Sequence, residues 1–159
     1  MYKNIKQGWY KLENPERFVP PKDSHMKSFN ESAGEIQYKS GLELKAFSYI
    51  DRNPNVKAFS IEPFAIKYLN PLDGQYHRYF VDMYIEFEDG NRFIVEIKPK
   101  SQVFPPKKPD RATRKSIASH KKAMETYRVN SAKWTAAREF ARVNDMRFVF
   151  LTDEELKKY

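Results

Sequence analysis

The chain of 159 residues is long enough for one hydrophobic core and too short for two, so a single body is expected. It has no cysteine, which excludes disulfide bonds and thiolate zinc sites, and no apolar run of the roughly 18–20 residues that span a membrane. With 29 Lys and Arg against 21 Asp and Glu, its net charge of +8 suits a polyanion such as nucleic acid, but charge alone does not identify one. The N-terminus shows no signal-peptide pattern, so a soluble, non-exported protein is expected.

The first 37 residues are polar and punctuated by proline, and they are predicted to form an irregular N-terminal arm. Three aromatic side chains could order this arm on the body: Trp9, Tyr10 and Phe18. Residues 38–159 are predicted to form one α/β domain. Its first helix is expected to begin at Ser40 and run to Asp51, because Asn53-Pro54 then disfavours helix.

Four strands are predicted in the middle of the chain from their β-branched and aromatic content and the turn residues between them. They cover residues 56–61, 64–69, 78–87 and 92–98. The last two are expected to pair as a hairpin across Glu88-Asp89-Gly90-Asn91.

The C-terminal third is predicted to be mainly helical. Residues 99–110 contain four prolines and three lysines and are expected to form a loop. Residues 112–143 follow a helical pattern, with an interruption expected at Val129-Asn130. A buried strand over 146–151 should follow, and Thr152 with Glu155 three residues later is a capping-box pattern for a short last helix.

Three charged residues occupy positions on the predicted hairpin that strand geometry relates to one another. Glu96 and Lys98 are two residues apart, so they share a face. If the hairpin turns through three residues with Gly90 in the left-handed conformation, counting back places Asp82 opposite Glu96. A two-residue turn would place Asp82 opposite Ile97 and send the two carboxylates to opposite faces.

Two facing carboxylates repel each other and require a counter-charge, which a hard divalent cation supplies. Asp82 and Glu96 are suitable ligands, together with the backbone carbonyl of Ile97. Lys98 could orient or deprotonate an attacking water, or neutralise a phosphate. The alternative is a solvated charge cluster without chemistry; the apolar residues on both faces of these strands argue against it, because unpaired charge in a buried sheet is costly.

Glu43 has two interpretations that the spacing leaves open. In the sequence Ser40-Gly41-Leu42-Glu43 it completes a capping box, with its carboxylate on the Ser40 N–H. It also shares a helical stripe with Ala46, Phe47 and Ile50, which would direct the carboxylate toward the sheet.

Several segments match patterns of a known nuclease superfamily. They are the Ser-x-x-Glu helix start, NPNVKAFSIEP, HRYFVD and VEIKPK, followed by AKWTAAREFA and FVFLTDEEL. The run resembles the PD-(D/E)xK nuclease core in its TnsA-like variant. Over about residues 38–156 it resembles more closely the head completion nucleases of tailed, T4-like phages.

The resemblance implies a restriction-endonuclease-like α/β core, with a mixed central sheet flanked by helices. It implies that Glu43, Asp82 and Glu96 bind Mg²⁺ or Mn²⁺ and that Lys98 is the catalytic lysine. The proline that the superfamily's name places before the aspartate is Val81 here.

Further residues are candidates for supporting roles or for DNA contacts. Glu62 falls in the family pattern and could support the ligands, or lie at a strand end without a role. Six basic residues flank the site in sequence and are interpreted as a sequence-independent backbone clamp, or else as a solvated charge run: Lys100, Lys107, Lys108, Arg111, Arg114 and Lys115. His77 and Arg78 could touch phosphate or form a turn salt bridge, and Lys133 could face the site or solvent.

The function predicted from the sequence is metal-dependent hydrolysis of DNA phosphodiester bonds, acting in phage head completion and DNA-end processing before tail attachment. The expected partners are DNA, with little sequence preference, and phage portal or head proteins, with no membrane. A homo-oligomer is among the options, and the expected location is the host cytoplasm during assembly or the virion. Two alternatives stay open: a non-catalytic virion protein that binds DNA ends or the portal, and a transposon-end or repair endonuclease subunit.

Overall fold

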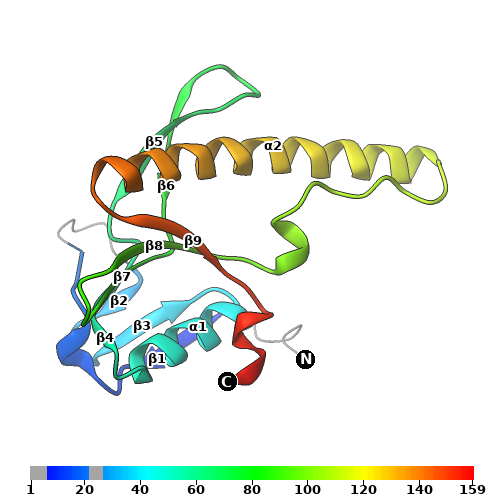
Figure 1. The fold of residues 1–159 in the computed structure, drawn as a ribbon. Coiled ribbons are helices and arrows are strands. Elements are labelled where there is room, and N and C mark those ends of the chain that lie inside the picture. The colour runs from blue at the N-terminus through cyan, green and yellow to red at the C-terminus, as the bar shows by residue number, and fades with distance from the viewer. Residues whose placement is uncertain (1–6, 22–26) are drawn as a thin grey trace.

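The computed structural model of the chain, which describes residues 7–21 and 27–159, is built around a four-stranded mixed sheet of order β4-β7-β8-β9 (Figure 1). Its strands are β4 (Val56–Ile61), β7 (Met83–Phe87), β8 (Arg92–Ile97) and β9 (Arg147–Leu151). The first three pair antiparallel, and β9 runs parallel to β8. Helix α1 (Gly41–Arg52) packs on one face and helix α2 (Arg114–Val143) on the other. The predicted mixed sheet flanked by helices is confirmed.

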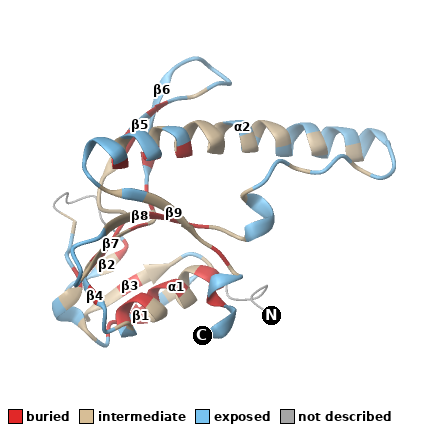
Figure 2. Cartoon of the chain, viewed as in Figure 1, coloured by how far each residue is buried: buried red, intermediate tan, exposed pale blue. Residues whose placement is uncertain are grey.

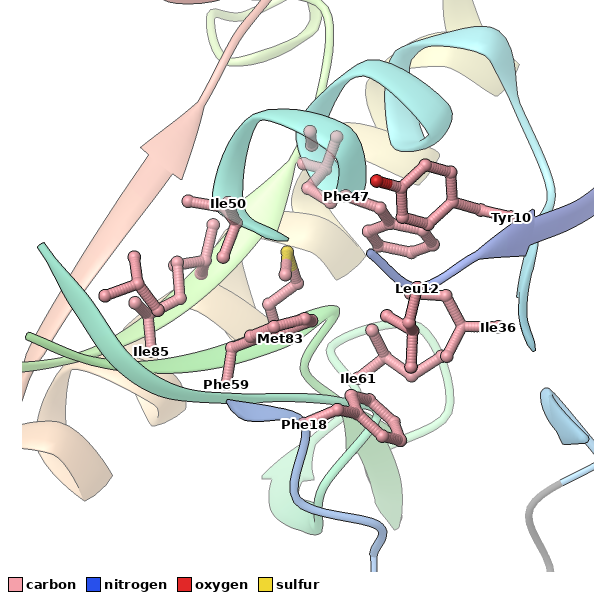
Figure 3. Close-up of a cluster of buried hydrophobic side chains, with 14 of the residues drawn as sticks. Tyr10, Leu12, Phe18, Ile36, Phe47, Ile50, Phe59, Ile61, Met83 and Ile85 are labelled. Atoms are coloured by element: carbon pink, nitrogen blue, oxygen red, sulfur yellow. The ribbon is translucent and has the colours of Figure 1, made fainter. Parts of the chain in front are cut away.

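The face of the sheet toward α1 is apolar. Phe59 and Met83 are fully buried there, and Ile85 is nearly so. Figure 3 shows these side chains lying against Phe47 and Ile50 of α1. The helix begins as predicted, because the Ser40 hydroxyl accepts a hydrogen bond from the Glu43 N–H at 3.1 Å.

The N-terminal region is not irregular, so that prediction was wrong for its described part. Strands β1 (Gly8–Lys11), β2 (Phe29–Asn30) and β3 (Glu35–Tyr38) form an antiparallel sheet of order β1-β3-β2, with a short 3₁₀ helix, η1 (Pro15–Arg17), after β1. Tyr10 and Phe18 are buried in the same cluster as α1 and β4, whereas Trp9 is 44% exposed. The remaining residues of the arm, 1–6 and 22–26, lie outside the described part, and a domain boundary at residue 37 stays a prediction.

Buried Asp51 at the end of α1 fixes this N-terminal sheet. Its carboxylate accepts hydrogen bonds from the Tyr10 hydroxyl at 2.9 Å and from the backbone N–H groups of Glu13 and Asn14 at 2.7 and 3.1 Å. A buried carboxylate requires such donors, so one residue joins the first strand to the first helix.

The predicted strand 78–87 is two strands in the structure, interrupted at Val81-Asp82. Strand β6 (Tyr76–Phe80) pairs with β5 (Ala65–Leu69) in a separate hairpin, whereas β7 pairs with β4 and β8. The hairpin rises beyond α2 in Figure 1. The chain therefore changes strand partners at the aspartate that the sequence singled out.

The β7–β8 turn has the three-residue geometry that the chemical interpretation required. Gly90 has a φ of +87° and donates its N–H to the Phe87 carbonyl at 3.0 Å, and the Phe87 N–H donates to the Asn91 carbonyl at 2.9 Å. Met83 pairs with Val95, and the same count places Asp82 opposite Glu96. The predicted register is confirmed.

Helix α2 runs unbroken for 30 residues from its Thr113 cap, so the interruption predicted at Val129-Asn130 was wrong. Its C-terminal half buries Trp134, Ala137 and Ala141, while its N-terminal half extends past the sheet and is largely exposed (Figure 2). The loop before it contains a 3₁₀ turn, η2 (Lys100–Gln102).

The chain ends as the sequence predicted in outline. Strand β9 is half-buried rather than buried, and the terminal helix η3 (Glu155–Lys158) is 3₁₀. The predicted capping contact forms, because both the N–H and the hydroxyl of Thr152 donate to the Glu155 carboxylate. Within the described ranges, no helix combines the length and apolarity that crossing a bilayer requires.

Candidate active site

Three charged side chains gather at one end of β7 and β8, and two of them, Glu96 and Lys98, lie on the side of α2. The Asp82 carboxylate (Oδ2) accepts the Ile97 N–H at 2.7 Å, and the Lys98 ammonium lies 3.4 Å from Glu96 Oε1. The structure therefore brings together Asp82, Glu96 and Lys98, as the strand parity predicted.

Glu96 is held on both carboxylate oxygens. It is 7% exposed, Oε1 faces the Lys98 ammonium, and Oε2 accepts a hydrogen bond from the buried Tyr79 hydroxyl. Burial, followed by the negative charge of Glu96, raises the pKa of Tyr79 far above its usual value, so this hydroxyl remains a neutral donor. The tyrosine fixes the orientation of the glutamate.

Sequence reasoning missed Tyr79 for a geometric reason. On an unbroken strand over 78–87, Tyr79 and Asp82 would lie on opposite faces. The partner change at Val81-Asp82 ends that alternation and brings Tyr79 beside Glu96. The only local signal was the tyrosine's place in the HRYFVD segment.

Helix α2 covers the site with an aromatic ring and a cation. The Lys98 ammonium lies 5.8 Å from the centroid of the Trp134 ring. The Lys133 ammonium lies 5.7 Å from the ring centroids of both Tyr68 and Tyr79. Of the two positions considered for Lys133, the structure has the one that faces the site.

Glu43 lies at the start of α1 and lines a small pocket together with Asp82. Its carboxylate accepts the N–H of Lys39 at 2.5 Å instead of the Ser40 N–H that a capping box uses. Both interpretations hold in part, because Ser40 caps the helix while the Glu43 carboxylate points to the pocket of Asp82.

Glu62 joins this pocket from the end of β4. Its carboxylate pairs with the Lys39 ammonium at 2.6 Å and accepts the Ser28 hydroxyl at 3.2 Å, and its N–H donates to the Asp82 carbonyl at 3.0 Å. Its φ of +42° is unusual for a residue with a side chain. Glu62 therefore contacts the backbone of one candidate ligand, Asp82, and, through Lys39, the side chain of another, Glu43.

Negative charge outweighs positive charge at the site. Burial, followed by the charge of Glu96, raises the pKa of Asp82 well above its ordinary value; the Ile97 N–H, and to a smaller extent Lys98, oppose this. Burial is also the largest cause that raises the pKa of Glu43, with Glu62 and Glu96 adding to it. A cation would relieve this crowding.

The donor set is suited in type to a hard divalent cation, because it consists of carboxylate oxygens. In the part of the chain that the structure describes, no three His, Asp or Glu side chains converge as a ready-made metal cage. The residues that would hold such an ion are Asp82 and Glu96, whose backbones face each other, with Glu43 turned toward them from α1.

The predicted DNA-contact residues fall in three places. Five lie exposed on the loop before α2 and at the free end of that helix: Lys107, Lys108, Arg111, Arg114 and Lys115. Lys100 is paired with Glu154 at 2.5 Å. His77 contacts Asp73 at 2.7 Å, the turn contact considered for it, and Arg78 lies over the Phe80 ring on the other face of β6.

The mixed sheet flanked by helices is consistent with a restriction-endonuclease-like nuclease, and comparison with known proteins identifies the family. Residues 53–153 match the family described as TnsA-like endonuclease N terminal, a span that includes Asp82, Glu96 and Lys98. The chain therefore belongs to the TnsA-like endonuclease family. The Head completion nuclease of Enterobacteria phage T4 is 33% identical over 123 residues, which cover 77% of this chain and 82% of that protein. The resemblance seen in the sequence is confirmed, and the family favours a nuclease over a non-catalytic DNA-binding protein.

Proposed function

We propose that this endonuclease hydrolyses phosphodiester bonds of DNA, with little sequence preference, when Mg²⁺ or Mn²⁺ is bound at Asp82, Glu96 and Glu43. The observation that carries the proposal is the meeting of Asp82, Glu96 and Lys98 at one end of the sheet, with an excess of negative charge. The backbone carbonyl of Ile97 is the fourth proposed ligand.

The side chains have separate roles. A bound divalent cation supplies Lewis-acid chemistry and lowers the pKa of its water. Asp82 is oriented through one oxygen by the Ile97 N–H, and Tyr79 orients Glu96. Lys98 lies between Glu96 and the Trp134 ring, and in this proposal it orients the attacking water and offsets the charge that develops on the phosphate.

The distribution of charge supports DNA as the substrate. Residues 98–133 contain eleven Lys and Arg and only two Asp and Glu. The rest of the chain has 18 Lys and Arg and 19 Asp and Glu. The whole positive excess therefore lies on the loop and helix that follow the site. Exposed lysines and arginines along one element bind the phosphate backbone without reading bases.

The T4 relative is a head completion nuclease, and this supports a role in phage head completion, with DNA ends processed before tail attachment. It favours that context over a transposon-end or repair subunit. Portal or head proteins are the proposed protein partners, and the host cytoplasm during assembly or the virion is the proposed location. A homo-oligomer would allow two sites to cut both strands.

The test is nicking of supercoiled plasmid by the wild type, Asp82→Asn and Lys98→Met, each with Mg²⁺, with Mn²⁺ or with EDTA. Binding of the same plasmid in EDTA is measured in parallel. Two exposed residues on the same sheet provide matched controls: Asp89→Asn in the β7–β8 turn, and Lys57→Met, whose lysine pairs with Glu86 at 3.3 Å.

The proposal predicts cleavage that requires the metal, is lost in both site variants and persists in both controls, while every protein binds DNA. Cleavage in EDTA would contradict the metal dependence. Wild-type protein that binds but never cuts, or site variants that cut like the wild type, would contradict the catalytic assignment.

A further inference from the structure

The β5–β6 hairpin has two unlike faces. One face carries Ile66, Tyr68 and Tyr79, which are buried in the cluster that includes Ala137 of α2. The strand register places alternate residues on the opposite face. This outer face consists of Ala65, Lys67, Leu69, Tyr76, Arg78 and Phe80.

The outer face presents large apolar side chains to solvent. Tyr76 is 65% exposed, Leu69 is 50% exposed and Phe80 is 45% exposed. Several large apolar side chains exposed on one strand face indicate a binding surface, because exposed apolar residues are ordinary singly but not in such a group.

Cations are interleaved with these rings. The Lys67 ammonium lies 4.4 Å from the centroid of the Tyr76 ring, and the Arg78 guanidinium lies 5.2 Å from that of the Phe80 ring. The outer face has no acidic residue, and neither cation pairs with an acid among the described residues. The surface is therefore aromatic and positive, which suits a polyanion with exposed rings better than an apolar protein partner.

We propose that the outer face of the β5–β6 hairpin binds single-stranded DNA, with bases stacked on Tyr76 and Phe80 and the backbone contacted by Lys67 and Arg78. The inference deepens the proposed function and rests on it. It names the substrate class as DNA that has unpaired bases next to the bond to be cut, because bases inside a duplex offer no free face to a ring.

The spacing of the two rings supports an extended strand. Tyr76 and Phe80 are four residues apart on one strand, about 13 Å at 3.3 Å per residue. This is several times the roughly 3.4 Å between neighbouring bases of B-DNA. The rings would therefore hold separate bases of an opened strand.

The same strand connects this face to the catalytic carboxylates. Phe80 precedes Asp82 by two residues, and Tyr79, on the inner face, donates its hydroxyl to Glu96. Single-stranded DNA held on the outer face is thus bound by β6, which leads directly into the site.

The test uses the full chain in EDTA, so that no cleavage occurs, and measures fluorescence anisotropy with two labelled probes. One is a thymidine dodecamer, and the other is a dodecamer of the same backbone with abasic sites throughout. The variants are Tyr76→Ser/Phe80→Ser and Trp9→Ser, which removes an exposed ring (44%) on the distant strand β1. Melting temperatures verify that each variant is folded.

The inference predicts that the wild type and Trp9→Ser bind the thymidine probe about tenfold or more tightly than the abasic probe. The double variant should bind both probes with the affinity that the wild type has for the abasic one. Equal wild-type affinity for the two probes, or a preference that survives in the folded double variant, would overturn it.

Two further results separate this inference from the proposed function. If the base preference is present but plasmid is never cleaved with either metal, the proposed nuclease function fails and the stacking surface stands. If plasmid is cleaved but the base preference is absent, the nuclease stands and the stacking surface is overturned.

Discussion

The two faces of the central sheet are made by alternate residues of the same strands, yet they have different tasks. Toward α1, Phe59, Met83 and Val95 are at most 2% exposed and entirely apolar. Toward α2, β8 ends with Glu96 and Lys98, and Asp82 lies beside them at the same end of the sheet. The apolar face toward α1 stabilises the fold, whereas the end near α2 holds closely spaced charges that are proposed to act in catalysis. Substitutions at neighbouring positions should therefore separate the two properties.

The largest expected effect is on the charged face. Glu96→Gln should lower the rate of plasmid nicking about 10²–10⁴-fold, because it removes a proposed metal ligand and the partner of Lys98. The measurement is kcat/KM at saturating Mg²⁺. Its neighbour Val95→Ala points to the α1 face and should keep its activity per folded molecule; equal activity losses in the two variants would break the comparison.

The converse effect is expected at Phe59 on the apolar face. Phe59→Ala should lower the free energy of unfolding by about 3–5 kcal/mol, because it leaves a cavity in a fully buried position. Urea unfolding followed by circular dichroism measures this. The nicking rate, corrected for the folded fraction, should stay near that of the wild type, and a large loss of corrected activity would show that the two faces are not independent.

Tyr79→Phe sharpens the comparison with a smaller change. Without the hydroxyl, Glu96 keeps its charge but loses the donor to Oε2, so activity should fall about 10–100-fold and the Mg²⁺ concentration for half-maximal rate should rise. A titration of nicking rate against Mg²⁺ measures this. An unchanged Mg²⁺ requirement would show that the hydrogen bond has only a structural role.

The smallest effect on stability is expected at the free end of α2. Lys115→Gln/Lys122→Gln should change the free energy of unfolding by less than about 0.5 kcal/mol, because both residues are exposed. The double variant should weaken duplex binding and reduce the slope of log K against log salt by about 0.9 for each phosphate that the helix no longer neutralises. Exposed Lys157→Gln/Lys158→Gln, in η3 near the C-terminus, is the matched control; equal salt slopes in all three proteins would exclude α2 from the DNA interface.

The sequence predicted the local geometry of the site well, because that geometry depends on short-range rules. The sequence allowed a two-residue or a three-residue turn at Gly90, and only the three-residue turn that the structure has gives the register that places Asp82 opposite Glu96. Ser40 and Asn53-Pro54 likewise mark the ends of α1. The roles of these residues, including Glu43, stay predictions until variants are measured.

Features that depend on tertiary context were missed. Residues 78–87 are rich in aromatic and aliphatic side chains and lack glycine and proline, so nothing in them indicated the change of strand partner at Val81-Asp82 or the contact of Tyr79 with Glu96. Strands β1 and β3 have only four residues each, too few for alternation to show among polar neighbours. Helix α2 continues through Val129-Asn130 because packing outweighs weak local propensity.

We expect the Asp82 carboxylate to be required for catalysis and, at the same time, to lower the stability of the folded chain. Its raised pKa means that the folded chain holds the proton more tightly than the unfolded chain does. Without metal, stability should therefore fall as the pH rises from the ordinary value of 3.8 through the raised pKa. Asparagine can still accept the Ile97 N–H but cannot ionise, so Asp82→Asn should escape this loss.

The most direct test measures melting temperature in EDTA from pH 4 to pH 8, and plasmid nicking with Mg²⁺, for the wild type and Asp82→Asn. We predict that the variant is inactive yet melts higher than the wild type, by a margin that grows with pH. A variant that nicks plasmid like the wild type would contradict a catalytic role for Asp82. A variant that melts lower than the wild type across the pH range would contradict the claim that Asp82 lowers stability.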